Sequence, residues 1–255
     1  LNTRAIKYPV DPGSVIKPIL FSILLENSLV NPYENVYLEE GKYTLRGKTI
    51  TDSHKMGRAI AEEVITQSSN IGMTKFAQRL SPASYFEGLV KFGFARSTGV
   101  DMPYEKVGSI PSLNMLNSDI YKATVSYGYG MQATFIQVLK AYNVFNNGGV
   151  TMSPRVGSYF TSSSSARSFI REPAKENVLS EVSANTMKNI LIKTVREGTG
   201  KAANLPGLEI GGKTGTAHIA VAGRYENYYN SSFFGFANDK KSKYTIGVMV
   251  YGLGS

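Results

Sequence analysis

Three short motifs hold the residues of this chain that are most capable of chemistry. Ser14-Val15-Ile16-Lys17 lies near the start, Ser68-Ser69-Asn70 lies further along, and Lys213-Thr214-Gly215-Thr216 lies near the end. In chain order they read S-x-x-K, S-x-N and K-T-G, a combination associated with a serine acyl-transfer site. Taken alone, each motif is more simply a helix cap or a turn. Because all three occur in this order, each at an expected element boundary, we interpret them as parts of one site.

A serine hydroxyl is a weak nucleophile unless a base lies within hydrogen-bond distance. The histidines are His54 and His218, and neither lies in a G-x-S-x-G setting. We therefore expect both to be surface or satisfied histidines, and we expect Lys17, one helical turn after the nucleophile Ser14, to be the base. Burial beside another cation lowers the pKa of a lysine in the direction that a base requires. Lys213 would supply that charge if its strand lies against the start of the helix.

The serine of the middle motif has an expected role in proton transfer. Ser68 would relay a proton between Lys17, Lys213 and the leaving amine. The backbone N–H of Ser14, facing a strand N–H near Thr216, would form an oxyanion hole, in which each donor contributes about 3–4 kcal/mol in measured cases.

The remaining motif residues are expected to bind substrate. Asn70 would hold a substrate amide. The hydroxyls of Thr214 and Thr216, together with the Lys213 ammonium, suit a carboxylate. Gly215 would leave the strand open as a wall for the substrate backbone.

Hydrophobic periodicity predicts the elements that must position these residues. Apolar side chains at spacings of three and four predict helices at residues 14–28, 55–66, 71–80, 83–92, 134–146 and 182–195. Alternation predicts strands at residues 208–210, 216–221, 232–237 and 244–251, with a turn at Ala222-Gly223. Short ribbons are expected at residues 31–52, mostly loop at 93–130, and an exposed serine-rich loop at 158–168.

This order of elements predicts an α+β chain with a single acyl-transfer domain over residues 1–255. Its helical part would cover about residues 14–150, and its last helix and an antiparallel meander about residues 180–255. The meander would carry K-T-G at one edge.

Composition narrows the class of protein further. The chain has 255 residues, of which 42% are hydrophobic and 18% charged, typical of a globular protein. A net charge of +9 suggests an anionic partner. The basic residues are scattered, however, and lack interleaved aromatics, so we do not expect nucleic-acid binding. There is no cysteine and no metal-ligand spacing around either histidine, so neither a metal nor another cofactor is expected.

The most apolar run, residues 19–25, is too short to span a bilayer. The first residues also lack the pattern of a signal peptide. If the protein works outside the cytosol, we expect its targeting segment to lie upstream of these residues.

The chain resembles the transpeptidase domain of class B penicillin-binding proteins over nearly all of its length. Segments around each motif are similar to those of the family, and so are several connecting segments. The main ones are Asp11-Pro12-Gly13-Ser14-Val15-Ile16-Lys17-Pro18, Ile65-Thr66-Gln67-Ser68-Ser69-Asn70-Ile71-Gly72-Met73, Tyr127-Gly128-Tyr129-Gly130-Met131-Gln132, Val195-Arg196-Glu197-Gly198-Thr199-Gly200 and Phe233-Phe234-Gly235-Phe236-Ala237. The Ser-Ser-Asn form of the middle motif resembles the division-associated branch.

The resemblance implies an antiparallel sheet flanked by helices with an all-helical subdomain. It implies an enzyme of the cell inner membrane, facing the periplasm, that cross-links peptidoglycan stem peptides in septal wall synthesis. In that family the serine, here Ser14, attacks the D-alanyl-D-alanine carbonyl and is acylated by β-lactams. Lys17, Ser68, Asn70, Lys213, Thr214 and Thr216 would take the roles given above. Membrane proteins of the division complex would be partners.

The family domain normally opens with two further strands and closes with a helix. We therefore expect these residues to be a fragment, without a membrane anchor, and the sheet to be incomplete with an uncovered edge. A closed five-stranded sheet would contradict this expectation.

Two alternative functions share the serine site. A β-lactamase or D,D-carboxypeptidase would hydrolyse the acyl-enzyme, and a class A β-lactamase needs a carboxylate to activate the water. Glu181-Val182-Ser183-Ala184-Asn185 has an E-x-x-x-N spacing that helix capping also explains, and Arg171-Glu172-Pro173 with Asn177 has one residue too many. A non-catalytic β-lactam sensor is the other alternative.

Overall fold

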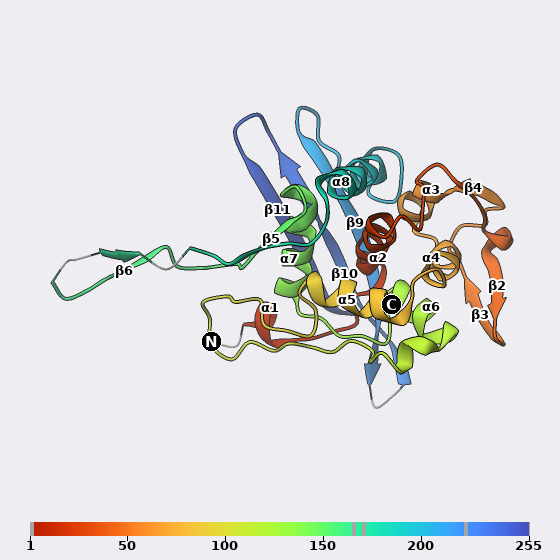
Figure 1. The fold of residues 1–255 in the computed structure, drawn as a ribbon, viewed down its shortest axis with the longest axis horizontal. Coiled ribbons are helices and arrows are strands. Elements are labelled where there is room, and N and C mark those ends of the chain that lie inside the picture. The colour runs from red at the N-terminus through yellow and green to blue at the C-terminus, as the bar shows by residue number, and fades with distance from the viewer. Residues whose placement is uncertain (1–2, 165–166, 170–171, 222–223, 255) are drawn as a thin grey trace.

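The computed structural model describes residues 3–164, 167–169, 172–221 and 224–254 (Figure 1). Its long strands form one antiparallel sheet in the order β11-β10-β9. They are β9 (Glu209–Val221), β10 (Arg224–Asn238) and β11 (Lys243–Gly254). β9 lies at one edge of this sheet, and Lys213 pairs with Phe234 of β10. The predicted meander and the edge position of K-T-G are confirmed.

The predicted strands at 208–210 and 216–221 are one continuous strand, so the expected break between them is wrong. Gly211 and Gly212 lie inside β9 rather than in a turn. A Cβ on Gly211 would lie 2.3 Å from the Phe236 ring, and one on Gly212 would lie 2.3 Å from the Phe233 ring. These glycines therefore make room for aromatic rings, a use of glycine that sequence alone does not separate from a turn.

Helices cover one face of the sheet and extend into a helical layer beside it (Figure 1). The α-helices are α1 (Arg4–Lys7), α2 (Lys17–Glu26), α3 (Ala61–Thr66), α4 (Asn70–Ala77), α5 (Pro82–Lys91), α6 (Asp119–Ser126), α7 (Phe135–Asn146) and α8 (Glu181–Arg196). The 3₁₀ turns are η1 (Gly13–Ile16), η2 (Glu39–Gly41), η3 (Met115–Asn117) and η4 (Lys201–Ala203). The eight consecutive residues from Lys17 to Leu24 are buried, so α2 is the central helix. The α+β class is confirmed.

Short strands pair away from the main sheet. Their bounds are β1 (Asn35–Tyr37), β2 (Lys42–Leu45), β3 (Lys48–Thr51), β4 (Arg58–Ile60), β5 (Val150–Met152), β6 (Tyr159–Thr161), β7 (Arg167–Phe169) and β8 (Lys175–Asn177). The pairs are β1 with β4, β2 with β3, β5 with β8 and β6 with β7. In Figure 1 the β6–β7 hairpin extends far from the sheet and the helices. Residues 159–161 and 167–168 of the predicted loop at 158–168 are thus in paired strands, so the prediction is wrong for them.

Four predicted helix boundaries are wrong by two or more residues. The helix predicted at 71–80 ends at Ala77. The helix predicted at 55–66 begins only at Ala61, because β4 pairs with β1 and the Glu63 carboxylate accepts the Ile60 N–H at 2.7 Å. The helix predicted from Ser14 begins at Lys17, after the η1 turn, and ends at Glu26 rather than near residue 28.

One helix was missed in the stretch predicted to be mostly loop. α6 begins after Ser118, whose hydroxyl accepts the Tyr121 N–H at 3.5 Å, and it buries Ala123 and Val125. The turn predicted at Ala222-Gly223, and Arg171, lie outside the described residues.

The main sheet has three strands in the described ranges, not five. Alternate residues of β11 share the face that the helices do not cover. They are Tyr244, Ile246, Val248 and Val250, which are 40–61% exposed. The closed five-stranded sheet that would have contradicted the expectation is therefore not found among the described residues. Among the described residues, no helix combines the length and the apolar character that a membrane span requires.

A buried tyrosine ties the helical layer to both the sheet and the nucleophile turn. The Tyr142 hydroxyl of α7 donates to the Val15 carbonyl of η1 at 2.6 Å. Its ring centroid lies 5.7 Å from that of Phe234 on β10. The carbonyl of Val15 is buried, so a lost donor is not replaced by water.

We therefore predict that Tyr142→Phe lowers the free energy of unfolding by about 1–2 kcal/mol, because it removes one buried hydrogen bond without opening a cavity. Urea denaturation measures this change. Tyr244→Phe, on the 61% exposed Tyr244, is the control and should change stability by less than about 0.5 kcal/mol. Equal effects would contradict the assigned role of the hydroxyl.

Candidate active site

The three motifs meet at one cleft of about 570 Å³. Seven of the eight predicted site residues line it, namely Ser14, Lys17, Ser68, Asn70, Thr214, Gly215 and Thr216. The eighth, Lys213, lies behind them and reaches the Ser68 hydroxyl. The structure thus brings together residues that lie up to two hundred positions apart in the chain.

The two motif lysines converge on Ser68. The Lys17 ammonium nitrogen Nζ lies 3.0 Å from Ser68 Oγ and 2.8 Å from the Ser68 carbonyl oxygen. Lys213 Nζ lies 3.0 Å from the same Oγ and 2.8 Å from the Thr214 carbonyl oxygen. Because both amines donate to Ser68 Oγ, the hydroxyl proton of Ser68 is left to point elsewhere, into the cleft.

Burial lowers the pKa of both amines. Lys17 is 1% exposed and Lys213 is 0% exposed. Desolvation is the largest cause of a Lys17 pKa well below its ordinary value, the charge of Lys213 lowers it further, and the charge of Asp52 opposes the shift. Desolvation lowers the pKa of Lys213 to about 7. The predicted effect of a second cation beside Lys17 is confirmed, although burial contributes more.

The nucleophile motif occupies a tight turn pressed against β9. The Ser14 carbonyl accepts the Lys17 N–H, which closes the η1 turn. Gly13 has φ +64° and donates its N–H to the Gly128 carbonyl at 3.0 Å. A Cβ on Gly13 would lie 2.9 Å from the Thr216 carbonyl oxygen. Only glycine allows this approach of turn and strand.

Gly215 contributes to the same contact from the strand. A Cβ there would lie 2.8 Å from Val15 Cγ1 and 3.1 Å from Ser232 Oγ. A larger residue at position 215 would thus collide with Val15 and Ser232 of the protein itself. The close contact between β9 and η1 therefore requires a glycine there.

The junction between α3 and α4 holds Ser68 in an uncommon backbone conformation. Its φ of +59° is left-handed, which is costly for a residue other than glycine. The Thr199 N–H donates to the Thr66 carbonyl at 3.0 Å and so links the end of α8 to this junction. A Cβ on Gly198 would lie 2.2 Å from that carbonyl oxygen. The Gly198-Thr199 turn therefore packs directly under the chain that presents Ser68.

Asp52 is a site residue that the sequence analysis missed. Its carboxylate accepts the Ser69 hydroxyl at 2.5 Å and the backbone N–H groups of Asn70 and Ile71 at 2.6 and 3.1 Å. The Ser69 hydroxyl in turn accepts the Gly72 N–H at 2.9 Å. Asp52 therefore caps α4 from a distant strand end, and no local pattern in the sequence indicates this.

Other cleft residues were also missed or were assigned no role. Tyr127, Tyr129, Thr199, His54 and His218 line the cleft. Both histidines are exposed, as predicted. The Tyr129 hydroxyl accepts the His218 N–H at 3.3 Å and so connects the cleft floor to β9.

The predicted amide-binding residue is held in place by a strand end. The Asn70 side chain donates its N–H to the Thr51 carbonyl at 3.0 Å. Its carbonyl oxygen remains an acceptor. Among the described residues, no group of acidic or histidine side chains could hold a metal ion.

The model of the penicillin binding protein transpeptidase domain matches residues 1–252. The chain therefore belongs to the family of penicillin binding protein transpeptidase domains, and the family predicted from the motifs is confirmed.

Curated relatives extend well beyond the matched region. The chain is 30% identical to penicillin-binding protein PbpB of Mycobacterium tuberculosis over 262 residues, covering 98% of this chain and 38% of that protein. It is 30% identical to stage V sporulation protein D of Bacillus subtilis, covering 89% and 36%. It is 26% identical to a probable peptidoglycan D,D-transpeptidase PenA of Neisseria gonorrhoeae, covering 98% and 41%. The chain thus spans less than half the length of these relatives.

Solved structures share the fold. Penicillin binding protein 3 of Mycobacterium tuberculosis, complexed with aztreonam, matches with a TM-score of 0.91 at 30% identity, covering 99% of this chain and 58% of that one. The transpeptidase domain of penicillin-binding protein 3 of Burkholderia pseudomallei matches with a TM-score of 0.87 at 29% identity, covering 98% and 73%. The sheet and helices described above are therefore those of this fold.

Removing the Asp52 carboxylate should destabilise the junction that carries Ser68. We predict that Asp52→Ala lowers the free energy of unfolding by about 2–3 kcal/mol, because three donors lose a charged acceptor. Asp52→Asn keeps one acceptor oxygen and should cost less. Asp239→Ala is the control, since Asp239 accepts two backbone N–H groups in an exposed turn. Urea denaturation that gives equal losses for Asp52→Ala and Asp239→Ala would contradict this account.

The pKa of Lys213 predicts a pH dependence of stability. Between pH about 7 and its ordinary value of 10.5, the unfolded chain keeps this lysine protonated and the folded protein does not. The unfolded state then binds more protons, so the free energy of unfolding rises with pH across this window and gains nothing below it. Lys17 acts in the same direction.

We expect thermal unfolding of the wild type between pH 7 and 9 to show this rise. Lys213→Met should reduce its slope, and Lys240→Met, at an exposed lysine, should leave the slope unchanged. The same slope in wild type and Lys213→Met would be inconsistent with a neutral buried Lys213.

Proposed function

We propose that this chain is the catalytic domain of a peptidoglycan D,D-transpeptidase that works through an acyl-enzyme on Ser14 and is inhibited by β-lactams. The observation that carries the proposal is the pair of buried amines, Lys17 and Lys213, within 3.0 Å of the Ser68 hydroxyl beside the Ser14 turn. Membership of the transpeptidase family supports the substrate class.

In the first step Ser14 Oγ attacks the carbonyl of the penultimate D-alanine, and Lys17 takes the hydroxyl proton. A neutral lysine amine that donates to the Ser68 carbonyl and Oγ keeps its lone pair free for this proton. The depressed pKa of Lys17 favours this neutral form at physiological pH. The backbone N–H of Ser14 and one near Thr216 stabilise the oxyanion.

In the next step the carbon–nitrogen bond breaks and D-alanine leaves. The proton moves from Lys17 through the Ser68 hydroxyl to the departing amine. Lys213 donates to the same oxygen and holds it in line. An amine of a second stem peptide then attacks the ester and releases Ser14 by the reverse proton path.

The substrate-binding roles follow from the cleft walls. Thr214 and Thr216 on β9, with Lys213 behind them, bind the terminal carboxylate, and Asn70 binds a substrate amide. Gly215 keeps β9 close to the nucleophile turn. The family resemblance supports a role in septal wall synthesis. The whole protein would be anchored in the membrane, face the periplasm and work with membrane proteins of the division complex.

Among the described residues, no carboxylate of the kind that a class A β-lactamase needs lines the cleft. Glu181 begins α8 and is exposed. It is not among the cleft-lining residues, and neither is Glu172. The E-x-x-x-N spacing therefore gives no support to a class A β-lactamase.

Mass spectrometry after exposure to a penicillin tests the proposal. We expect the wild type to gain one long-lived adduct on Ser14 and Ser14→Ala to gain none. Lys17→Ala should slow adduct formation by at least about 100-fold, as expected for a general base. An adduct that persists in Ser14→Ala would overturn the assignment. Rapid release of hydrolysed penicillin would instead favour the β-lactamase or carboxypeptidase, and acylation without cross-linking by the intact protein would favour the sensor.

A further inference from the structure

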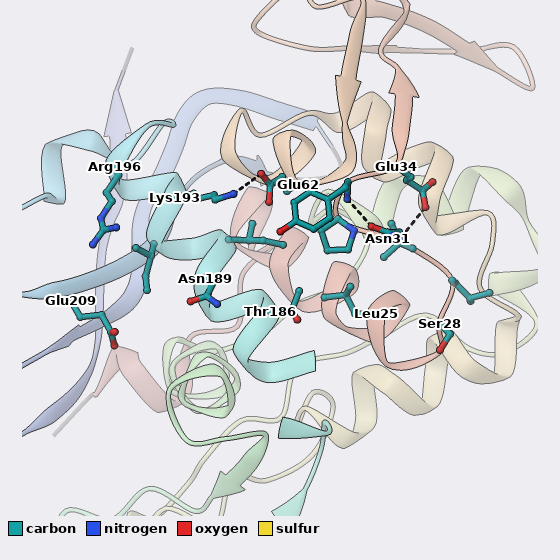
Figure 2. A pocket seen from close by; sticks show the side chains of 16 residues that line it. Leu25, Ser28, Asn31, Glu34, Glu62, Thr186, Asn189, Lys193, Arg196 and Glu209 are labelled. Atoms are coloured by element: carbon teal, nitrogen blue, oxygen red, sulfur yellow. Dashed lines mark hydrogen bonds and ion pairs between the residues drawn. The ribbon is translucent and has the colours of Figure 1, made fainter. Parts of the chain in front are cut away.

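A hollow larger than the active-site cleft lies elsewhere on the molecule. It is a groove of about 1110 Å³ between the exposed face of α8 and the loop that follows α2 (Figure 2). One wall consists of α8 side chains spaced along the helix, Thr186, Asn189, Lys193 and Arg196. They extend over about 15 Å of helix. The groove therefore accommodates an elongated ligand.

The opposite wall presents an aromatic ring on a rigid loop. Tyr33 is 70% exposed and lines the groove, together with Asn31 and Glu34, which Figure 2 labels. The Asn31 side chain accepts the Tyr33 N–H at 2.9 Å, and the Glu34 carboxylate accepts the Asn31 N–H at 2.9 Å. Arg79 pairs with Glu34 at 2.6 Å. These bonds fix the backbone that carries the ring, so the loop loses little entropy when the ring binds a ligand.

The loop is also fixed to the helix that leads to the active site. The Ala61 and Glu62 N–H groups at the start of α3 donate to the Glu34 and Pro32 carbonyls at 2.8 and 2.9 Å. Glu62 forms an ion pair with Lys193 of α8 at 2.8 Å. The two walls are thus clamped to each other at this end of the groove.

The chemistry of the lining favours a neutral, polyhydroxylated ligand. The acids Glu34, Glu62 and Glu209 are paired with bases, and the bases in the lining are Lys193 and Arg196, so the groove lacks the surplus of positive charge that a nucleic acid requires. Its apolar lining residues include Val30, Ile190 and Ile192, which are buried and so offer no exposed apolar centre of the kind found in protein interfaces.

The groups left to bind a ligand are the Tyr33 ring, the amide of Asn189, the hydroxyl of Ser28 and the guanidinium of Arg196. The Thr186 hydroxyl already donates to the Val182 carbonyl at 2.8 Å, so it can only accept. These groups suit the C–H face and the hydroxyls of sugar rings.

The groove lies within peptide reach of Ser68. Ser68 follows Glu62 by six positions, a separation of about 9 Å along a helix. An extended peptide covers about 3.4 Å per residue, so about three residues bridge this distance. At the other end, Arg196 lines the groove and Thr199 lines the cleft.

We infer that this groove binds the glycan strand from which the stem peptide reaches the active site. The inference rests on the proposed function, because it assigns a place to the polymer that carries the substrate peptide. Tyr33 and Asn189 bind sugar rings, and the peptide then runs past Gln67 and Thr199 toward Ser14.

Binding of peptide-free glycan tests this site. The probe is cell-wall glycan from which an amidase has removed the stem peptides, and the measurement is its dissociation constant with the intact protein. We expect Tyr33→Ala and Asn189→Ala each to weaken binding by about tenfold. The controls are Tyr104→Ala, at an 80% exposed tyrosine outside the groove, and Asn185→Ala, one turn earlier on α8. Both controls should bind as the wild type does.

Activity provides a second readout. Tyr33→Ala should raise the KM for glycan-bearing substrate and leave kcat unchanged, and it should leave kcat/KM for a free stem peptide as in wild type. Equal glycan affinity in wild type and Tyr33→Ala, or no affinity in the wild type, would overturn the inference. Acylation of Ser14 by penicillin in the same variants is measured separately. If the wild type is not acylated, the proposed function fails, whereas normal acylation without glycan binding removes only the groove assignment.

Discussion

Two buried amines that share one hydroxyl impose the main constraint on this structure. Lys17 and Lys213 are almost completely removed from water, and both lie 3.0 Å from Ser68 Oγ. Placing two cations there would cost far more than a few hydrogen bonds return. The arrangement is tolerable only because desolvation shifts both pKa values toward the neutral amine. Burial of these two amines therefore lowers the stability of the fold, and the same burial lets Lys17 accept a proton.

Such a site must be held from several directions, because no single element contains it. The η1 turn is held by the Tyr142 hydroxyl, the Ser68 junction by the Asp52 carboxylate and the Thr199 N–H, and the K-T-G strand by its pairing with β10. These contacts come from different parts of the fold, namely α7, the end of β3, the turn after α8 and the main sheet. The helical layer and the sheet thus serve to bring three short segments into hydrogen-bond distance of one oxygen.

The parts predictable from sequence are those encoded locally. The apolar stripes of α5, α7 and α8, and the alternation in β11, predicted those elements within a few residues, whereas the prediction for β10 covered only its second half. The motif residues could be grouped because their order along the chain is characteristic of the family. The parts that were missed depend on distant partners: β4 exists because β1 pairs with it, and Asp52 caps a helix that begins many residues later. The loop around Tyr33 was predicted only as irregular, since the bonds that make it rigid come from α3 and Arg79.

The glycines where turn, loop and strand touch restrict how this site can evolve. A Cβ on Gly128 would lie 1.9 Å from the Gly13 carbonyl oxygen, and a Cβ on Gly215 would meet Val15. A larger residue at these positions would push the nucleophile turn away from β9. The variant would then lose both ligand binding and catalysis. Changes in ligand preference that keep the site intact are therefore expected at cleft-lining residues outside this contact, such as His54 and Gln67. Residues where the nucleophile turn, the Gly128 loop and β9 touch therefore tolerate little substitution, whereas residues at the rim of the cleft tolerate more.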